Sequence, residues 1–314
     1  MSQTLLLIGP LLPSVMDTLE STYTVHRYWE STDKDALLAS IADSCIGVVT
    51  DGGNGVSADI LKKLPAVKIV SVFGVGVDAV DLAWCRDHGI RVSNTPDVLS
   101  DDVADMAMAL ALAVSRQLVV GDQYARAGKW PAQGAMPLTR RVMGKRAGIY
   151  GMGSIGKALA MRLEGFRMPI SYCNRSPRSD SENYTFVASL EELASQVDYL
   201  FVTAAATAGT IGSIDAGVLD ALGPDGYLIN VSRGTLVDET ALLSCLQEKR
   251  IAGAGLDVFA DEPNIPPAFF TLDNVVLQPH NASGTWETRE AMGKLVLDNL
   301  AAYLAGQPLL TAVV

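Results

Sequence analysis

The sequence predicts an α/β protein built from two successive series of alternating strands and helices. Short apolar runs recur along the chain, and segments with helical periodicity lie between most of them. A glycine-rich turn, Gly151–Gly156, follows the first apolar run of the second series and precedes a helical pattern. Parallel sheets with helices on both faces explain this alternation, because their strands are buried on both sides.

The first series occupies the N-terminal part of the chain. Its apolar runs are short and separated by helical patterns, which indicates one parallel sheet covered by helices on both faces. The expected strands are Thr4–Ile8, Tyr23–Tyr28, Cys45–Thr50, Lys68–Phe73 and Arg91–Ser93, and the candidate helices include Asp35–Ile41, Ala58–Leu64 and Asp81–His88.

A long apolar helix is expected over about Asp101–Ser115, and an irregular segment follows it. The helix is rich in Ala, Met and Leu and apolar on most faces, so we expect it to be buried between two bodies. Arg116–Gly144 then interrupts the alternation with several Gly and Pro residues, and it carries Trp130. Irregular segments of this length are usually functional or form an interface, which we expect here instead of a mobile surface loop.

The second series begins at Arg146. Its apolar runs match the strand number of a complete dinucleotide-binding sheet, and helical patterns lie between most of them. A last helix is expected over about Trp286–Ala305. The expected strands are Ala147–Tyr150, Ile170–Cys173, Tyr199–Thr203, Tyr227–Val231, Ala254–Phe259 and Val275–Leu277.

The composition is that of a soluble, acidic globular protein. Hydrophobic residues make up 49% of the 314 residues, and no apolar run approaches the roughly 20 residues that span a bilayer. The formal net charge of −11 argues against nucleic acid or an anionic membrane as the main partner. The four cysteines lack C-x-x-C or zinc spacing, so we expect reduced thiols, no metal site and a cytoplasmic location.

The turn Gly151–Gly156 has the G-x-G-x-x-G pattern in the context that the pattern requires. It follows an apolar strand and opens a helical segment, Lys157–Leu163. Gly151 permits the tight turn, Gly153 lets the backbone approach a pyrophosphate at the helix N-terminus, and Gly156 allows close packing of helix on strand. The sequence therefore predicts a dinucleotide site.

The residues after the next strand distinguish NADP from NAD. An NAD enzyme usually offers an acidic residue to the ribose hydroxyls about 20 residues beyond the loop. The present chain has no acid in Tyr172–Arg178. Arg175 offers a planar donor fork for a 2′-phosphate, Ser176 a hydroxyl, and Arg178 further charge. We therefore predict NADPH as the cofactor, with NADH as a weaker second one.

Three runs near the end of the chain each place one ionisable side chain at or just after an apolar run, namely Arg233, Glu262 and His280. A 2-oxo acid needs donors for its carboxylate and a proton for its carbonyl oxygen. We expect Arg233 to hold the carboxylate and His280 to act as general acid, because imidazole titrates near neutral pH. Glu262 is expected to hydrogen-bond the other ring nitrogen of His280. Side chains from consecutive βα units can meet at one sheet edge, where such folds bind ligands.

These residues lie in segments that resemble the three signatures of the D-2-hydroxyacid dehydrogenase family, and the resemblance covers essentially the whole chain. The signature segments are Val231–Gly234, Gly255–Pro263 and Pro279–Ser283, and the glycine loop and Asn94–Pro96 fit too. Within the family the chain is most similar to the glyoxylate/hydroxypyruvate reductase branch, which includes hydroxyphenylpyruvate reductases. The closer match rests on Phe73–Asp78, Asn174–Ser176 and Leu309–Val314.

The resemblance implies an α/β fold of two domains with a cleft between them. One is a doubly wound Rossmann cofactor domain, expected over residues 98–287, and the other a smaller, flavodoxin-like βα substrate domain. The substrate domain is expected to be discontinuous, with residues 1–97 and 288–314. The family also implies a homodimer, formed through the cofactor domain and an arm at about residues 116–144.

The resemblance further implies roles for single residues. Backbone N–H groups of Val75 and Gly76 are expected to bind the substrate carboxylate, and Ser283 to lie beside the catalytic histidine. In related reductases a tryptophan on the arm reaches the partner's active site, as Trp130 is expected to do. Asp257 should face the nicotinamide carboxamide. The expected cofactor-binding residues are thus Gly151, Gly153, Ser154, Ile155, Gly156, Asn174, Arg175, Ser176, Arg178 and Asp257.

The leading predicted function is NADPH-dependent reduction of small 2-oxo acids, with glyoxylate and hydroxypyruvate as expected substrates, to D-2-hydroxy acids. A bulkier aryl-pyruvate is the alternative within this chemistry, because the sequence does not show how Gly52–Gly55, Trp130 and Trp286 shape the pocket. A dinucleotide-sensing, corepressor-like binding protein is the alternative of another class, because the family contains transcriptional corepressors with this fold.

Overall fold

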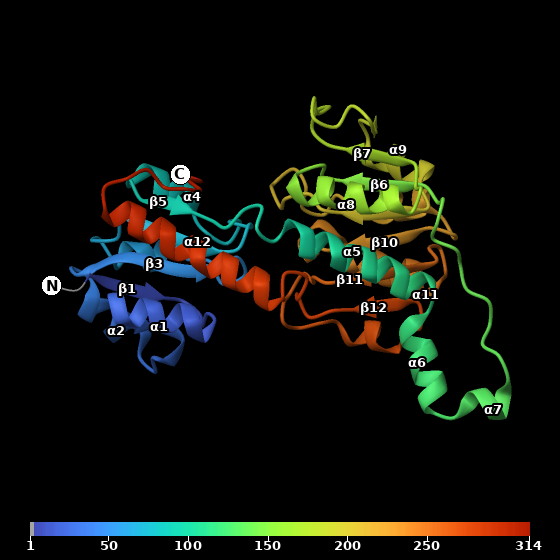
Figure 1. The fold of residues 1–314 in the computed structure, drawn as a ribbon, viewed down its shortest axis with the longest axis horizontal. Coiled ribbons are helices and arrows are strands. Elements are labelled where there is room, and N and C mark those ends of the chain that lie inside the picture. The colour runs from blue at the N-terminus through green and yellow to red at the C-terminus, as the bar shows by residue number, and fades with distance from the viewer. Residues whose placement is uncertain (1–2) are drawn as a thin grey trace. The chain divides into compact units, whose positions relative to one another are not determined.

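The computed structural model describes residues 3–314 and divides into two compact units. One unit combines the segment up to Leu99 with Gly284–Val314, and the other is Ser100–Ser283. Each unit has its own parallel sheet with helices on both faces (Figure 1). The predicted α/β class with two parallel sheets is therefore confirmed.

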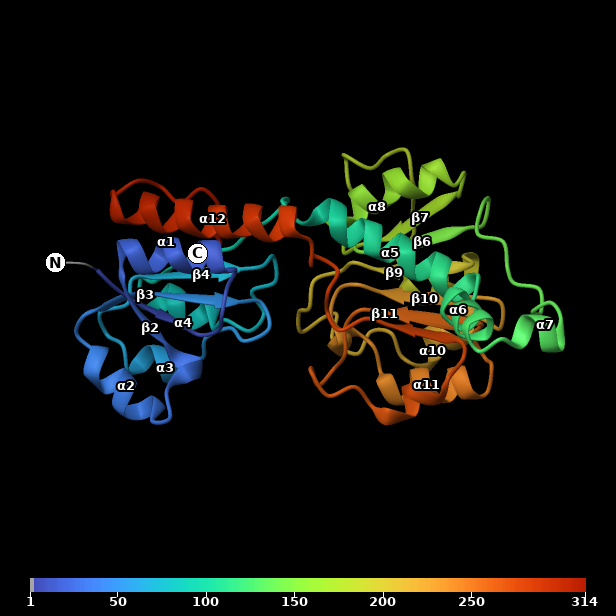
Figure 2. The same ribbon diagram turned by 60° about the horizontal axis from the view of Figure 1, so that its bottom comes forward.

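The first unit is built on a five-stranded parallel sheet. Its elements are β1 (Thr4–Leu7), α1 (Pro13–Thr22), β2 (Thr24–Arg27), η1 (Tyr28–Glu30), α2 (Lys34–Ile41), β3 (Cys45–Asp51), α3 (Ala58–Lys62), β4 (Ile69–Phe73), α4 (Leu82–Asp87), β5 (Arg91–Ser93) and α12 (Trp286–Leu304). The strand order β2-β1-β3-β4-β5 is the flavodoxin-like one. Residues of α2, α3 and α4 share an apolar cluster with strand residues, while α1 and α12 cover the opposite face (Figure 2).

Helix α12 joins the first unit although it follows the second in sequence. It packs against β4 and α1, and a Cβ on Gly293 would lie 2.2 Å from Cγ2 of Val15, so the two helices touch where glycine has no side chain. The buried Asn299 of α12 then holds the C-terminal segment, accepting from the amides of Leu310 and Thr311. Beyond that point the chain pairs with β5.

The second unit is built on a seven-stranded parallel sheet. Its elements are α5 (Ser100–Ser115), α6 (Leu118–Arg126), α7 (Lys129–Gln133), β6 (Ala147–Tyr150), α8 (Ser154–Gly165), β7 (Ile170–Cys173), β8 (Thr185–Phe186), α9 (Leu190–Gln196), β9 (Tyr199–Val202), α10 (Ala216–Leu222), β10 (Tyr227–Asn230), η2 (Gly234–Leu236), α11 (Glu239–Gln247), β11 (Gly253–Leu256), η3 (Pro267–Thr271) and β12 (Val275–Leu277). The strand order is β12-β11-β10-β9-β6-β7-β8. From β6 the sheet grows first to one side, through β7 and β8, and then to the other side, through β9 to β12, as in the doubly wound Rossmann sheet.

Two elements and one longer segment differ from the sequence-based expectation. Strand β8 was not expected, because two residues at a sheet edge make no recognisable apolar run. Helix α1 was also missed, although its buried Val15, Met16 and Leu19 have helical spacing. The segment Arg116–Gly144 is less irregular than expected, since it contains α6 and α7, which Gly128 separates in a left-handed conformation.

Helix α5 is largely buried, and it packs on β10, β11 and α8 of the second unit; its expected place between two bodies stays a prediction. Among residues 3–314 no single helix is long and apolar enough to cross a membrane; only the bent pair α5 and α6 passes such a test, by length and composition. The four cysteines are free and buried, and burial raises the pKa of Cys45 and of Cys85 to about 11. A thiol of this kind stays protonated at neutral pH and is unreactive.

Candidate active site

The glycine-rich turn lies between β6 and α8 and fits a dinucleotide pyrophosphate. Gly151 has φ +104°, and a Cβ there would lie 2.4 Å from the backbone after β9, so only glycine fits. A Cβ on Gly156 would lie 2.4 Å from the carbonyl oxygen of Gly151. Within residues 3–314 no side chain caps α8 at Gly153, which leaves the N–H groups of Ser154 and Ile155 available to an anion.

Asn174 connects the end of β7 to this turn. Its Oδ1 accepts a hydrogen bond of 2.7 Å from the amide of Met152, which fixes the distance between the strand end and the glycine turn. Arg175 and Ser176 follow directly and are exposed. The predicted ribose-side residues therefore stand at the carboxyl end of the second strand of the Rossmann sheet, where such folds bind the ribose.

Arg178 differs from Arg175 because its guanidinium is engaged by an acidic residue that the sequence analysis did not single out. Its Nε and Nη2 donate to Oδ1 and Oδ2 of Asp180 at 2.8 and 2.7 Å. Lys157, on the first turns of α8, donates to Oδ2 of the same carboxylate at 3.0 Å. The cluster of cationic side chains that is predicted to bind the 2′-phosphate of the ribose therefore also contains a carboxylate, that of Asp180.

The turn that carries Arg233 is fixed by side-chain and packing contacts. The buried Asn230 at the end of β10 donates to the carbonyl of Arg233 at 2.9 Å and accepts from the amide of Ser232 at 3.1 Å. A Cβ on Gly234 would lie 1.9 Å from the carbonyl carbon of Phe259. The glycine therefore lets this turn touch the loop after β11.

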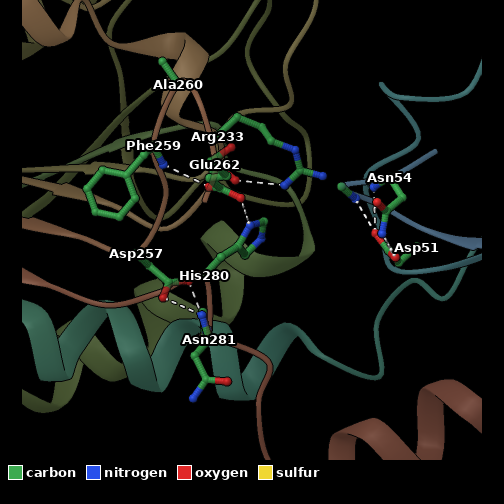
Figure 3. A network of polar contacts seen from close by, with 12 residues as sticks. Asp51, Asn54, Arg233, Asp257, Phe259, Ala260, Glu262, His280 and Asn281 are labelled. Atoms are coloured by element: carbon green, nitrogen blue, oxygen red, sulfur yellow. Dashed lines mark hydrogen bonds and ion pairs between the residues drawn. The ribbon is translucent and has the colours of Figure 1, made fainter. Parts of the chain in front are cut away.

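Glu262 and His280 form a direct contact. His280 Nδ1 and Glu262 Oε2 are 2.6 Å apart, and Oε1 of the same carboxylate accepts from the amide of Phe259 at 2.9 Å. The side chains are 41% exposed for His280 and 31% for Glu262, so they are accessible to a ligand. Figure 3 shows Arg233 pointing toward the same carboxylate.

The charges around Glu262 keep it ionised. Burial alone would raise the pKa of this carboxyl group, but the hydrogen bonds from His280 and the Phe259 amide, and the charges of His280 and Arg233, together lower it. Because the pKa lies below its ordinary value, Glu262 is a carboxylate at neutral pH. Its contribution to the stability of the folded protein is lost only as the pH falls through that lowered pKa.

Asp257 holds the backbone of His280 in an unusual conformation. His280 has φ +51°, in the left-handed region, and its amide donates to the Asp257 carbonyl at 2.7 Å. The fully buried carboxylate of Asp257 accepts from the amides of Asn281 and Ala282 at 2.7 and 3.0 Å (Figure 3). Burial raises the pKa of Asp257 despite these hydrogen bonds. Asp257 thus supports the histidine, and its predicted contact with the nicotinamide stays a prediction.

The remaining predicted substrate-binding residues come from separate parts of the chain. Val75 and Gly76 belong to the first unit, in the loop after β4, and no atom of residues 3–314 accepts from their amides. Ser283 is half-buried at the end of the second unit. Trp130, on α7, is 67% exposed, and its proposed reach into a partner subunit stays a prediction, as does the homodimer.

Two residues that position the site were missed by the sequence analysis. Asn230 is a polar residue inside an apolar run, which is a recognisable signal, because a buried amide needs partners. Glu239, at the start of α11, accepts from the amide of Ala260 at 2.8 Å and so supports the loop before Glu262. Its role gave no sequence signal, because it depends on a contact between segments that are distant in sequence.

Comparison with known proteins gives consistent matches. The family profile described as the NAD-binding domain of D-isomer-specific 2-hydroxyacid dehydrogenases matches residues 108–282. The chain is 47% identical over 310 residues to 2-ketogluconate reductase of Gluconobacter oxydans, covering 99% of this chain and 98% of the relative. It is 47% identical over 309 residues to hydroxyphenylpyruvate reductase of Plectranthus scutellarioides, covering 98% of each.

A solved structure agrees with these relatives. It is an NADPH-dependent glyoxylate/hydroxypyruvate reductase from Sinorhizobium meliloti in complex with NADP and malonate, with a TM-score of 0.94 and 41% identity. The match covers 100% of this chain and 97% of that one. The chain therefore belongs to the D-isomer-specific 2-hydroxyacid dehydrogenase family, and it is an oxidoreductase whose second unit is a Rossmann-like NAD-binding domain.

Proposed function

We propose that this protein reduces small 2-oxo acids to D-2-hydroxy acids with NADPH. The observation that carries the proposal is the contact of 2.6 Å between His280 Nδ1 and Glu262 Oε2, with Arg233 directed at the same carboxylate. When bound, the reduced nicotinamide supplies hydride, so the protein must hold a carboxylate and deliver one proton. His280 and Arg233 provide the donors for both tasks.

Each residue has a distinct task in this proposal. Arg233 binds the substrate carboxylate and polarises the carbonyl, since its guanidinium can form paired hydrogen bonds with a carboxylate. The proton goes from Nε2 of His280 to the carbonyl oxygen, because Nδ1 is held by Glu262. The amides of Val75 and Gly76 are further donors for the substrate carboxylate. In the reverse direction His280 accepts the proton of the hydroxyl group.

The relatives support 2-oxo acids as the substrate class, with several members as candidates. Glyoxylate and hydroxypyruvate are the leading substrates; the relatives also support an aryl-pyruvate and 2-ketogluconate, which share the same 2-oxo acid group. The test is NADPH oxidation with each acid in parallel. Fast turnover of one of them identifies it, whereas tight cofactor binding with no turnover of any would favour the corepressor-like alternative.

The NADPH preference is proposed to depend on Arg175, which is exposed beside Ser176 at the end of β7. Arg175→Ala is expected to raise KM for NADPH by about 10-fold or more, because a charge-assisted contact with a phosphate contributes roughly 1.5–3 kcal/mol. KM for NADH should stay nearly unchanged. Steady-state kinetics with both cofactors measure the ratio, and an unchanged ratio would contradict the assignment.

Glu262→Gln is expected to change the acidic side of the pH–rate profile of reduction. In the parent, the lowered pKa of Glu262 keeps its carboxylate ionised until the pH falls through that pKa, whereas glutamine keeps the size and a hydrogen-bond acceptor but carries no charge at any pH. We therefore expect kcat at neutral pH to fall by about 10-fold or more, with no further loss from this residue on acidification. Full pH–rate profiles of the variant and the parent measure the change. An acidic limb that is the same in both proteins would show that protonation of Glu262 does not limit the activity.

A further inference from the structure

The loop after β7 contains a carboxylate that is shared by two cations. Asp180 accepts from both Nε and Nη2 of Arg178, and its Oδ2 also accepts from Nζ of Lys157, which lies on α8 directly beyond the glycine turn. Hydrogen bonds from Arg178 and from Lys157 lower the pKa of Asp180. The carboxylate is therefore ionised under any condition in which the protein would be assayed.

These cations belong to the region proposed to bind the 2′-phosphate. Asn174 links the end of β7 to the glycine turn, Arg175 follows it, and the amide of Arg178 donates to the hydroxyl of Tyr172 in β7 at 2.9 Å. The loop therefore folds back on the strand that precedes it. A 2′-phosphate at Arg175 would approach Arg178 as well, since both arginines stand on this short loop.

Asp180 affects how much positive charge and how many donors the loop can offer to a 2′-phosphate. Arg175, Arg178 and Lys157 are cationic, and Asp180 offsets one of these charges while accepting from three of their nitrogen atoms, Nε and Nη2 of Arg178 and Nζ of Lys157. A carboxylate that accepts side-on from a guanidinium uses the donor geometry that a phosphate would use. A bound 2′-phosphate must consequently share or displace this contact, and it meets the repulsion of a fixed negative charge.

We propose that Asp180 is a specificity-determining residue, which occupies Arg178 and Lys157 in place of the 2′-phosphate and thereby limits the preference for NADPH over NADH. This inference rests on the proposed function, in which the 2′-phosphate binds beside Arg175. NAD lacks the phosphate, so its affinity does not depend on the exchange. Asp180 thus sets how far the two cofactors are distinguished.

The test is Asp180→Asn, with dissociation constants of NADP⁺ and NAD⁺ measured at fixed ionic strength. Asparagine keeps the shape of the side chain and removes its charge. Removing a like charge from the exposed loop that is proposed to hold the phosphate is expected to tighten NADP⁺ binding about three- to tenfold. Binding of NAD⁺ should not change. The gain should shrink at high salt, because exposed charges are screened.

Two further variants serve as controls. Asp220→Asn removes an equally negative residue that is paired with Arg250 elsewhere in the same unit, and it should change neither constant. Arg178→Ala combined with Asp180→Asn should lose most of the gain, because the released guanidinium is absent. Thermal unfolding of each variant checks that the exposed substitutions leave the fold intact.

The outcomes separate this inference from the proposed function. Unchanged or weaker NADP⁺ binding in Asp180→Asn, or an equal gain for NAD⁺, would overturn the role of Asp180. An unchanged cofactor ratio in Arg175→Ala would instead remove the NADPH assignment. The Asp180→Asn result is the ratio of its NADP⁺ dissociation constant to that of the parent. This ratio tests the role of Asp180 whichever cofactor the parent binds more tightly.

Discussion

His280→Asn is expected to lower kcat for 2-oxo acid reduction by about 10²–10⁴-fold, the usual contribution of a positioned general acid. Asparagine is the suitable replacement because His280 has φ +51°, a conformation that asparagine tolerates better than most residues. The amide of residue 280 can then keep its hydrogen bond to Asp257. The substitution should therefore leave the loop in place, and the fall in kcat should reflect the missing proton donor.

The measurement is steady-state kcat together with cofactor affinity. Binding of NADP⁺ should stay close to that of the parent, because His280 lies outside the glycine turn and the β7 loop. His88→Asn is the matched control: it removes an exposed histidine of the first unit and should leave kcat unchanged. An undiminished kcat in His280→Asn would exclude this histidine from proton transfer.

Arg233→Ala is expected to lower kcat/KM for the 2-oxo acid by about 10²–10⁴-fold, since two charge-assisted hydrogen bonds of roughly 1.5–3 kcal/mol each would be lost. Arg233→Lys should recover only part of this loss, because an ammonium cannot match the paired geometry of a guanidinium. The turn should survive both changes, as it is held by Asn230 and by the close packing of Gly234.

A second readout comes from Glu262, whose pKa is lowered in part by the charge of Arg233. Arg233→Ala should raise the pKa of Glu262, so activity should be lost at a higher pH as the solution is acidified. Arg233→Lys keeps the positive charge, so it should return this pH of activity loss close to the parent value while kcat/KM stays below that of the parent. Arg250→Ala, which removes a surface arginine paired with Asp220, controls for net charge. Equal kcat/KM values for Arg233→Ala and the parent would contradict the substrate-binding role.

The parts of the fold that follow from local pattern could be predicted. Buried strands such as β6 and β10 are continuous apolar runs, and the carboxyl ends of parallel strands share one edge, which is why Glu262 and His280 could be paired in advance. Strand β8 could not be predicted in this way, because two edge residues carry no period.

The supporting contacts of the site depend on tertiary structure and were beyond the sequence. The left-handed backbone of His280 is held by Asp257, from a different βα unit, and no local signal marks it. The same holds for Asp180. The sequence analysis did not single it out, whereas the structure shows it bridging Arg178 and Lys157.

The return of α12 to the first unit has a consequence for the order of folding during synthesis. When the ribosome has made the chain only up to Leu99, the surface of β4 and α1 that α12 will cover, including Val15, is still exposed. The contiguous second unit can complete its core first. The segment up to Leu99 therefore keeps part of its apolar surface exposed until α12 has been synthesised, and such exposed surface makes a nascent chain prone to aggregation.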